Sequence, residues 1–294
     1  MMSPRGSTAS HVSFFCGDWI PYAEIRLSPD DLGFRQGVTA VERLRTYGGN
    51  VFSFPQHWDR WQRTTEYLKL AGLPGKAETE ALVAELFHRN VDWIAAQGDV
   101  GITWFATPGI IGACRATLGL HLNQIDHVRV HHRREQGQVL LVTDVVQPPD
   151  ATWPRSLKVR SRIHYYHADQ LARQYDTDAS GILVDADGTV TETSIANLAI
   201  VEEGMIISPL RGQILGGITQ QAMESVAQQQ GLVWRKERIS KDRFVAAKEI
   251  LCMGTDTGIW FARQIAGQST DLRKAGPVYQ ALVRGFDQRV NAAT

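Results

Sequence analysis

Hydrophobic positions in the first half of the chain predict strands that enclose two helices. Strands are expected over residues 12–15, 19–27, 41–47, 101–106 and 116–122, and amphipathic helices over 58–71 and 76–97. The dipeptide Gly17-Asp18 is a hairpin turn signal between the first two strands. Gly72 and Pro74 are typical helix stops, so they end the first helix.

The second half of the chain is richer in short strands. Strands are expected over residues 139–146, 181–185, 190–201, 205–208 and 249–253, and helices over 163–175 and 218–230. The stretch 131–138 is the most polar in the middle of the chain. It predicts a linker at 133–138 between a smaller N-terminal domain (1–132) and a larger C-terminal domain (139–294). Because hairpins and helices occur without regular strand–helix–strand alternation, the pattern predicts an α+β fold.

Composition excludes several classes of protein. The 294 residues suffice for about two domains, and 43% hydrophobic residues can form sizeable cores. Lys and Arg (31) balance Asp and Glu (31), whereas non-specific nucleic-acid binders carry excess positive charge. No apolar run approaches the ~18 residues of a membrane span. A polar segment 1–10 without a signal-peptide pattern, and three distant cysteines (Cys16, Cys114 and Cys252), favour a cytoplasmic location.

Two glycine-containing loops are candidate ligand sites. At residues 216–219 (Gly-Gly-Ile-Thr) a loop of small residues meets the start of a predicted helix, where unpaired N–H groups and the helix dipole favour an anion such as phosphate. At residues 254–257 (Gly-Thr-Asp-Thr) a small polar loop follows an apolar strand, as binding loops often do. Taken singly, ordinary helix capping and a solvated turn are the simpler explanations.

Two ionisable residues are candidates for chemistry. Lys158 is crowded in the sequence by Arg155, Arg160 and Arg162. If Lys158 is recessed there, desolvation and like-charge repulsion lower its pKa, and a lysine in that state can form a Schiff base. Glu192 falls within an apolar strand, where a buried carboxylate can pair with a cation brought by a ligand. A solvated lysine and an outward-facing strand acid remain the alternatives.

The histidines do not predict a metal site. His127 and His131 lie in a segment whose alternating valines indicate a strand, which places side chains on two faces. His164 and His167 can share a helix face, but no cysteine or carboxylate stands at a suitable spacing. A serine hydrolase is not expected either, because the chain has no G-x-S-x-G motif.

In order and spacing, these segments resemble the class IV aminotransferases, the fold-type IV pyridoxal 5′-phosphate (PLP) enzymes. That family includes branched-chain and D-amino acid aminotransferases and 4-amino-4-deoxychorismate lyase. The resemblance runs from about residue 13 to residue 267 and is specific through its combination of motifs. Five matches carry it: Glu42 before a helix opening His57-x-x-Arg60, Lys158 with Arg162-Ile163 behind it, Glu192 with Ser194 and Asn197, Leu215-x-Gly217-Ile218-Thr219, and Gly254-Thr255 after a late strand.

The resemblance implies a two-domain α+β architecture with PLP in the cleft between the domains, and a homodimer. It implies that Lys158 is the catalytic residue, which forms a Schiff base with PLP, and that Glu192 holds the protonated pyridine nitrogen. The phosphate would be held by a guanidinium and a helix N-terminus. The remaining cofactor-binding residues that the resemblance implies are Arg60, Asn197, Gly217, Ile218, Thr219, Thr255 and Asp256.

The substrate side departs from the family pattern. Residues 36–42 (QGVTAVE) stand where the family has F-G-D-G-x-F/Y-E, and Gln220 replaces the usual arginine after Gly-Ile-Thr. Residues 104–109 lack the arginine with which D-amino acid aminotransferases hold a substrate carboxylate. Ile163 stands where the branched-chain enzymes have a tyrosine. No subfamily therefore fits the substrate side.

Arg43 and Arg45 are the candidate substrate residues. Side chains two apart on a strand point to one face, so both could bind a substrate carboxylate; a solvated basic edge is the alternative. The first hypothesis for function is a PLP-dependent aminotransferase, which acts on an amino acid or amine and a 2-keto acid, without nucleic-acid or membrane partners. A PLP-dependent 4-amino-4-deoxychorismate lyase and a non-catalytic PLP-binding protein are the alternatives.

Overall fold

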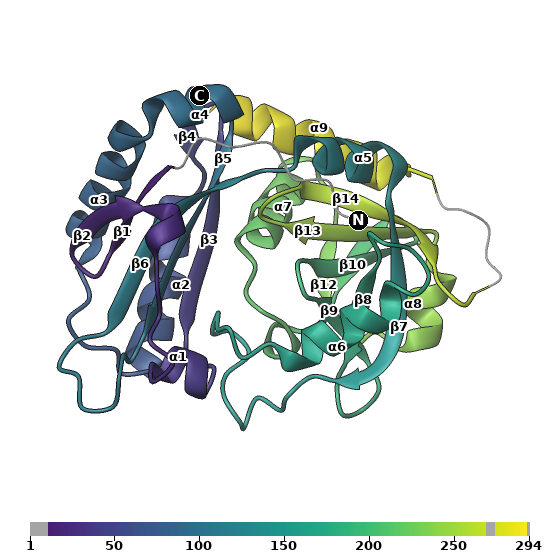
Figure 1. The fold of residues 1–294 in the computed structure, drawn as a ribbon. Helices are drawn as coiled ribbons and strands as arrows, with labels where there is room; N and C mark the ends of the chain where they lie inside the picture. Colours follow the sequence, from purple (N-terminus) through teal and green to yellow (C-terminus); the bar gives the residue numbers. More distant parts are fainter. Residues whose placement is uncertain (1–10, 269–273, 293–294) are drawn as a thin grey trace. The chain divides into compact units, whose positions relative to one another are not determined.

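The computed structural model describes residues 11–268 and 274–292, and the chain divides into two compact units. Unit 1 comprises the described residues up to Ile125 together with Val159–Ser161. Unit 2 comprises Asp126–Lys158 and the described residues from Arg162 onward. In Figure 1 the part of unit 1 up to Ile125 is purple to blue, and unit 2 is teal to yellow. The segment 1–10, from which the sequence argued against a signal peptide, lies outside the described residues.

Unit 1 is an antiparallel sheet accompanied by four α-helices and a short 3₁₀-helix among its described residues. Its strands, in the spatial order β2-β1-β6-β5-β3-β4, are β1 (Val12–Phe15), β2 (Asp18–Pro21), β3 (Ala40–Tyr47), β4 (Asn50–Val51), β5 (Val100–Thr107) and β6 (Thr117–Gln124). Its helices are η1 (Tyr22–Glu24), α1 (Leu32–Arg35), α2 (Phe54–Tyr67), α3 (Lys76–Arg89) and α4 (Val91–Gln97). Leu44, Trp61, Leu86 and Ile102 form part of the core where α2 and α3 pack on the sheet.

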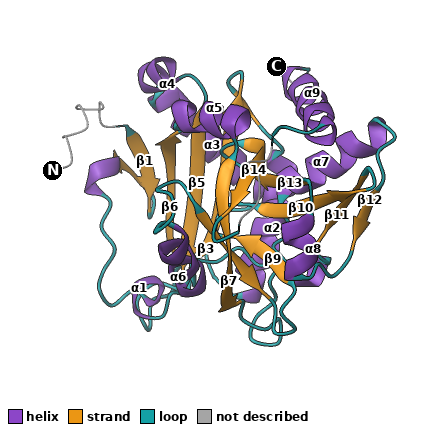
Figure 2. Ribbon diagram, turned by 90° about the vertical axis from the view of Figure 1, so that its right-hand side faces the viewer, coloured by secondary structure: helices purple, strands orange, loops and turns teal. Residues whose placement is uncertain are grey.

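Unit 2 is a mixed sheet whose strands close into a ring. The strands, in the order β12-β11-β10-β13-β14-β7-β8-β9, are β7 (Gln138–Val146), β8 (Ser180–Val184), β9 (Val190–Thr193), β10 (Asn197–Glu202), β11 (Met205–Ser208), β12 (Trp234–Lys236), β13 (Glu249–Gly254) and β14 (Gly258–Ile265). Because β9 also pairs with β10, the six strands from β10 to β9 form a closed path. Beyond the ring, β11 pairs with β10 and β12 pairs with β11 (Figure 2).

Five α-helices and a short 3₁₀-helix accompany this sheet among the described residues. They are α5 (His127–Gln136), α6 (Ile163–Ala172), η2 (Arg211–Gln213), α7 (Ile218–Gln229), α8 (Lys241–Ala246) and α9 (Pro277–Asn291). Helix α6 packs on β7 and β8, and α7 and α9 pack on each other and on β13 (Figure 2). The core includes Leu140, Ile182, Leu198, Ile250 and Trp260, all nearly inaccessible to solvent.

The polar stretch predicted as a linker is a helix instead. Residues 127–136 form α5, which packs on β14, and the boundary between the units lies at residues 125 and 126. Arg133 is buried there and forms two hydrogen bonds with Asp178, at 2.8 and 2.7 Å. The valines that suggested a strand do not form an inner face, since Val128 is 82% exposed. The expected strand around His127 and His131 is therefore wrong.

Most other expected elements are present, with shifted ends. The helix expected over 76–97 is two helices, because the backbone turns at Asn90 between α3 and α4. The pattern analysis missed α9, although Val278, Leu282, Phe286 and Val290 recur at helical spacing and are buried. Within the ranges described above, no helix is both long and apolar enough to cross a membrane.

Candidate cofactor site

Glu192 and Asn197 lie where the strand ring of unit 2 closes. The two residues face each other across β9 and β10, and both are buried. In the tight turn between the strands, the Thr193 hydroxyl accepts a hydrogen bond from the Ala196 amide at 3.0 Å. The single strand predicted over 190–201 is therefore two strands, and the turn between them brings Glu192 beside Asn197.

Four neutral groups donate hydrogen bonds to the Glu192 carboxylate. Its Oε1 accepts from the Tyr165 hydroxyl at 2.7 Å and from the Gln147 side-chain amide at 3.1 Å. Its Oε2 accepts from the Asn197 side-chain amide at 3.0 Å. The Leu215 backbone N–H lies within 3.2 Å of both oxygens. The carboxylate is thus fixed in orientation from four segments of the chain.

Lys158 supplies positive charge to the same surroundings. It is half-buried, in the loop between β7 and α6, and is the last residue of its segment of unit 2. Burial raises the pKa of Glu192, and the neutral donors and the Lys158 charge oppose that rise without reversing it. A carboxylate in this state is stabilised by a further positive charge beside it. The structure thus brings together Lys158 and Glu192, the two candidate chemical residues of the sequence.

Asn197 links Glu192 to the loop before α7. Its Nδ2 also donates to the Leu215 carbonyl at 2.9 Å. Its Oδ1 lies so close to Gly217 that a Cβ at that position would be 1.8 Å away. Since Gly217 has a φ of −69°, space rather than backbone conformation requires the glycine. The Asn197 and Gly217 expected in the cofactor site therefore pack directly on each other.

The N-terminus of α7 has the properties of an anion site. Gly217 is its N-cap, and no side chain caps the helix. The first N–H groups of an α-helix lack intrahelical partners, and the helix dipole favours negative charge there. Ile218 and Thr219 open the helix and are both buried. This geometry is suited to a phosphate, as the Gly-Ile-Thr motif predicts.

Thr255 and Asp256 lie in the turn between β13 and β14. Strand β13 pairs with β10, so this turn leaves the sheet next to the start of β10. Gly254 lies against the Ile195 carbonyl, where a Cβ would be 2.3 Å away. The Gly-Thr loop and the turn that follows Glu192 are therefore neighbours in unit 2.

Tyr165 and Gln147 are site residues that the sequence analysis missed. Ile163 stands where the branched-chain enzymes have a tyrosine, and its side chain is 82% exposed. Tyr165, two residues later on α6, is the tyrosine that donates a hydrogen bond to Glu192. Burial and the Glu192 charge raise the pKa of Tyr165 well above its usual range, which keeps its hydroxyl a donor. The signal that the sequence offered for this residue was a tyrosine within one helical turn of position 163.

Glu42, His57 and Arg60 form a second buried cluster, inside unit 1. Arg60 donates to both Glu42 oxygens at 2.7 Å, and His57 Nδ1 lies 2.7 Å from Oε2. Burial alone would raise the pKa of Glu42, but Arg60 and His57 lower it to about 2. The His-x-x-Arg match thus fixes α2 to β3. The contact of Arg60 with a phosphate stays a prediction.

Arg43 and Arg45 alternate on β3 with Glu42, so they lie on the opposite face of the sheet from it. The Arg43 guanidinium lies over Gly101 of β5, where a Cβ would be 2.4 Å from its central carbon. Arg43 also donates hydrogen bonds to Thr103, at 3.3 Å, and to Asn123. Gly101 therefore provides the space that this guanidinium occupies on the sheet.

The residues of unit 2 fit a PLP molecule. PLP carries a phosphate, a pyridine nitrogen and an aldehyde, which call for an anion site, a carboxylate and an amine respectively. The α7 N-terminus, Glu192 and Lys158 supply these three groups. The carboxylate with a raised pKa is the most specific of the three, because a protonated pyridine nitrogen would stabilise its charge.

Comparisons with known proteins agree with this geometry. A family model described as amino-transferase class IV matches residues 39–265. D-alanine aminotransferase of Staphylococcus aureus (strain COL) is 24% identical over 292 residues, which cover 95% of this chain and 98% of that protein. The branched-chain amino acid aminotransferase of Escherichia coli has a solved structure with a TM-score of 0.82 at 19% identity, and the match covers 95% of this chain and 94% of that chain.

A second solved structure has the same fold. The branched-chain aminotransferase of Thermoproteus uzoniensis, solved with norvaline, has a TM-score of 0.80 at 22% identity, and the match covers 96% of this chain and 95% of that chain. The expected α+β fold of fold-type IV, the aminotransferase activity and the PLP cofactor are confirmed. Since the family model spans most of the sequence, the chain belongs to the class IV aminotransferases, a family of PLP-dependent enzymes.

Proposed function

We propose that this aminotransferase moves an amino group between an amino acid and a 2-oxo acid, with PLP held by Lys158 and Glu192. The observation that carries the proposal is the buried Glu192 carboxylate, which has neutral donors, a raised pKa and Lys158 nearby. Bound PLP stabilises the negative charge that develops on the substrate α-carbon. Glu192 would keep the pyridine nitrogen protonated. The Lys158 amine would carry the α-proton when the substrate, and not Lys158, is joined to the cofactor.

The remaining site residues have supporting roles in this proposal. The amides at the start of α7, the Thr219 hydroxyl and Thr255 bind the phosphate, and Asp256 lies in the same turn as Thr255. The resemblance also implies that Arg60 binds the phosphate, and this contact stays a prediction. A homodimer and a cytoplasmic location remain predictions from the resemblance and the composition.

For the substrate carboxylate we propose Arg43 rather than Arg45. Arg45 lies 3.7 Å from the Asp99 carboxylate and places its guanidinium 4.0 Å from the centre of the Tyr47 ring, so it is held by its own strand and by an acid. Arg43 donates to the neutral side chains of Thr103 and Asn123. The contact with Asp99 already gives the Arg45 guanidinium a carboxylate within its own unit, so we favour Arg43 for the substrate carboxylate.

The test of the function is turnover with pyruvate or 2-oxoglutarate and a panel of amino donors. Keto-acid-dependent transfer is the expected result. Release of pyruvate from 4-amino-4-deoxychorismate without a co-substrate would identify a lyase instead, and PLP binding with neither activity would identify a non-catalytic protein. Arg43→Ala should raise KM for amino or keto acids about ten-fold while sparing phenylethylamine, and Arg45→Ala should do so less. Equal effects on both donor types would remove Arg43 from substrate recognition.

A further inference from the structure

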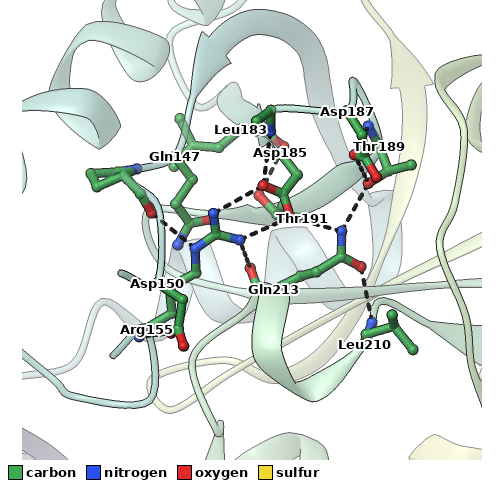
Figure 3. A network of polar contacts seen from close by, with 12 residues as sticks. Gln147, Asp150, Arg155, Leu183, Asp185, Asp187, Thr189, Thr191, Leu210 and Gln213 are labelled. Atoms are coloured by element: carbon green, nitrogen blue, oxygen red, sulfur yellow. Dashed lines mark hydrogen bonds and ion pairs between the residues drawn. The ribbon is translucent and has the colours of Figure 1, made fainter. Parts of the chain in front are cut away.

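A buried arginine lies at the centre of a polar network in unit 2 (Figure 3). Arg155 donates Nη1 and Nη2 to the two Asp185 oxygens, each at 3.0 Å, and Nε to the Pro148 carbonyl at 2.9 Å. Its Nη1 also lies 3.4 Å from the Gln213 carbonyl. The Gln213 side chain donates to Asp185 at 3.0 Å and to Thr189 at 2.8 Å. One guanidinium therefore connects three separate segments of the chain.

Each of these segments leads directly to a residue of the proposed cofactor site. Arg155 precedes Lys158 by three residues in the same loop. Asp185 directly follows β8 and opens the turn to β9, which carries Glu192. Gln213 precedes Leu215, whose amide contacts Glu192, and the start of α7. The network thus joins the three segments that carry Lys158, Glu192 and the N-terminus of α7.

The charges in the network favour one fixed geometry. The sequence suggested that Arg155 adds like charge beside Lys158, but the Arg155 guanidinium is paired with Asp185. Hydrogen bonds from Arg155 hold the pKa of Asp185 well below its usual range. A planar guanidinium with two bonds to one carboxylate fixes orientation as well as distance. Such a pair contributes less to net stability than to geometry, because burial of both charges is costly.

Unit 2 contains a matched pair that lies outside these three segments. Arg133 on α5 donates to Asp178 with two hydrogen bonds at 2.8 and 2.7 Å. Arg133 and Arg155 are each 8% exposed. Arg133 contacts none of the three segments through this pair, since Asp178 precedes β8. The two arginines therefore have similar burial and bonding, and differ in what they connect.

We propose that Arg155 and Asp185 are a positioning pair, which holds the loop of Lys158, the turn before Glu192 and the loop before α7 in the arrangement that binds the cofactor. The proposal rests on the proposed function. It goes beyond the assignment of residues that touch PLP, because neither side chain of the pair is one of the proposed cofactor ligands.

The test compares Arg155→Met with Arg133→Met, and adds the milder Asp185→Asn in case Arg155→Met fails to fold. Equilibrium titration with PLP should show affinity weakened about ten-fold or more in Arg155→Met and Asp185→Asn, and unchanged in Arg133→Met. The visible absorbance band of the bound cofactor should shift or lose intensity only in the first two variants. Arg155→Lys, which keeps the charge but not the planar fork, should recover part of the affinity.

Hydrogen exchange of the protein as purified provides a readout that needs no cofactor. Peptides covering residues 156–160 and 211–219 should exchange about ten-fold faster in Arg155→Met and remain protected in Arg133→Met. If both arginine variants behave alike in titration and in exchange, the positioning role is wrong. If the wild-type chain takes up no PLP, the proposed function fails, and the exchange comparison alone then supports or overturns the coupling of the two segments.

Discussion

Among the described residues each unit buries one glutamate, and the pKa values of the two carboxylates are shifted in opposite directions. Glu42 in unit 1 is 0% exposed and Glu192 in unit 2 is 3% exposed, so burial is the same. Glu42 is paired with Arg60 and His57, and its pKa falls to about 2. Glu192 accepts hydrogen bonds from neutral donors, and its pKa is raised. Glu42 is satisfied within the fold, whereas we propose that Glu192 is stabilised by the protonated pyridine nitrogen of bound PLP.

The largest expected effect comes from changing the unit 2 carboxylate. Glu192→Gln keeps the shape but cannot hold a pyridine nitrogen protonated, so turnover should fall at least ~100-fold. Because folding raises the pKa of Glu192, its ionised carboxylate destabilises the fold at pH values above its ordinary pKa. Glu192→Gln should therefore unfold at the same temperature as the wild type or at a higher one. Steady-state rates and thermal unfolding measure the two parts. Near wild-type turnover would place the partner of the pyridine elsewhere.

The same substitution in unit 1 should destabilise the fold, whereas Glu192→Gln should leave the stability unchanged or raise it. Glu42→Gln leaves Arg60 buried without its carboxylate, and should cost about 3 kcal/mol of unfolding free energy at neutral pH. Since the folded pKa of about 2 lies below the ordinary 4.5, Glu42 stabilises the fold above pH 4.5, and this contribution is lost as pH falls toward 2.

Denaturant titrations at several pH values would check this dependence. The difference between wild type and Glu42→Gln should shrink as pH falls from 4.5 toward 2. A difference that stays constant over this range would mean that the ionisation of Glu42 does not support the fold.

A smaller effect is expected at Tyr165. Tyr165→Phe removes the 2.7 Å donor from Glu192, which disfavours the ionised carboxylate and raises its pKa further. Turnover should fall about three- to ten-fold, and the acidic limb of its pH profile should move to higher pH. Tyr166→Phe is the matched control, because Tyr166 is the next residue of α6 and is 65% exposed. An unmoved acidic limb in Tyr165→Phe would separate this hydroxyl from the ionisation of Glu192.

The sequence predicted those site residues that belong to a short local motif. Lys158, Glu192 with Asn197, and Gly217 with Thr219 each belong to a local motif, and the structure places them all in unit 2. Tyr165 could not be assigned, because which tyrosine of α6 reaches Glu192 depends on the rotation of the helix against β7 and β8. Gln147 belongs to no motif, and it contacts Glu192 because it directly follows the end of β7.

The same reason explains the error at the polar stretch. Arg133 makes 127–136 look solvated in sequence, but its partner Asp178 lies 45 residues away along the chain. Asp185 and Gln213, which bind Arg155, are likewise distant in sequence. Contacts between residues that are far apart along the chain turn charged segments into packed ones, and local patterns do not show them.

The most direct test of the central claim, that unit 2 holds PLP on Lys158 beside Glu192, is to find where the cofactor is attached. Purified protein loaded with PLP is reduced with borohydride, digested and mapped by mass spectrometry. We expect the label on Lys158, with loss of labelling at that peptide in Lys158→Ala. Label on a different lysine of the wild-type chain would contradict the assignment of the site.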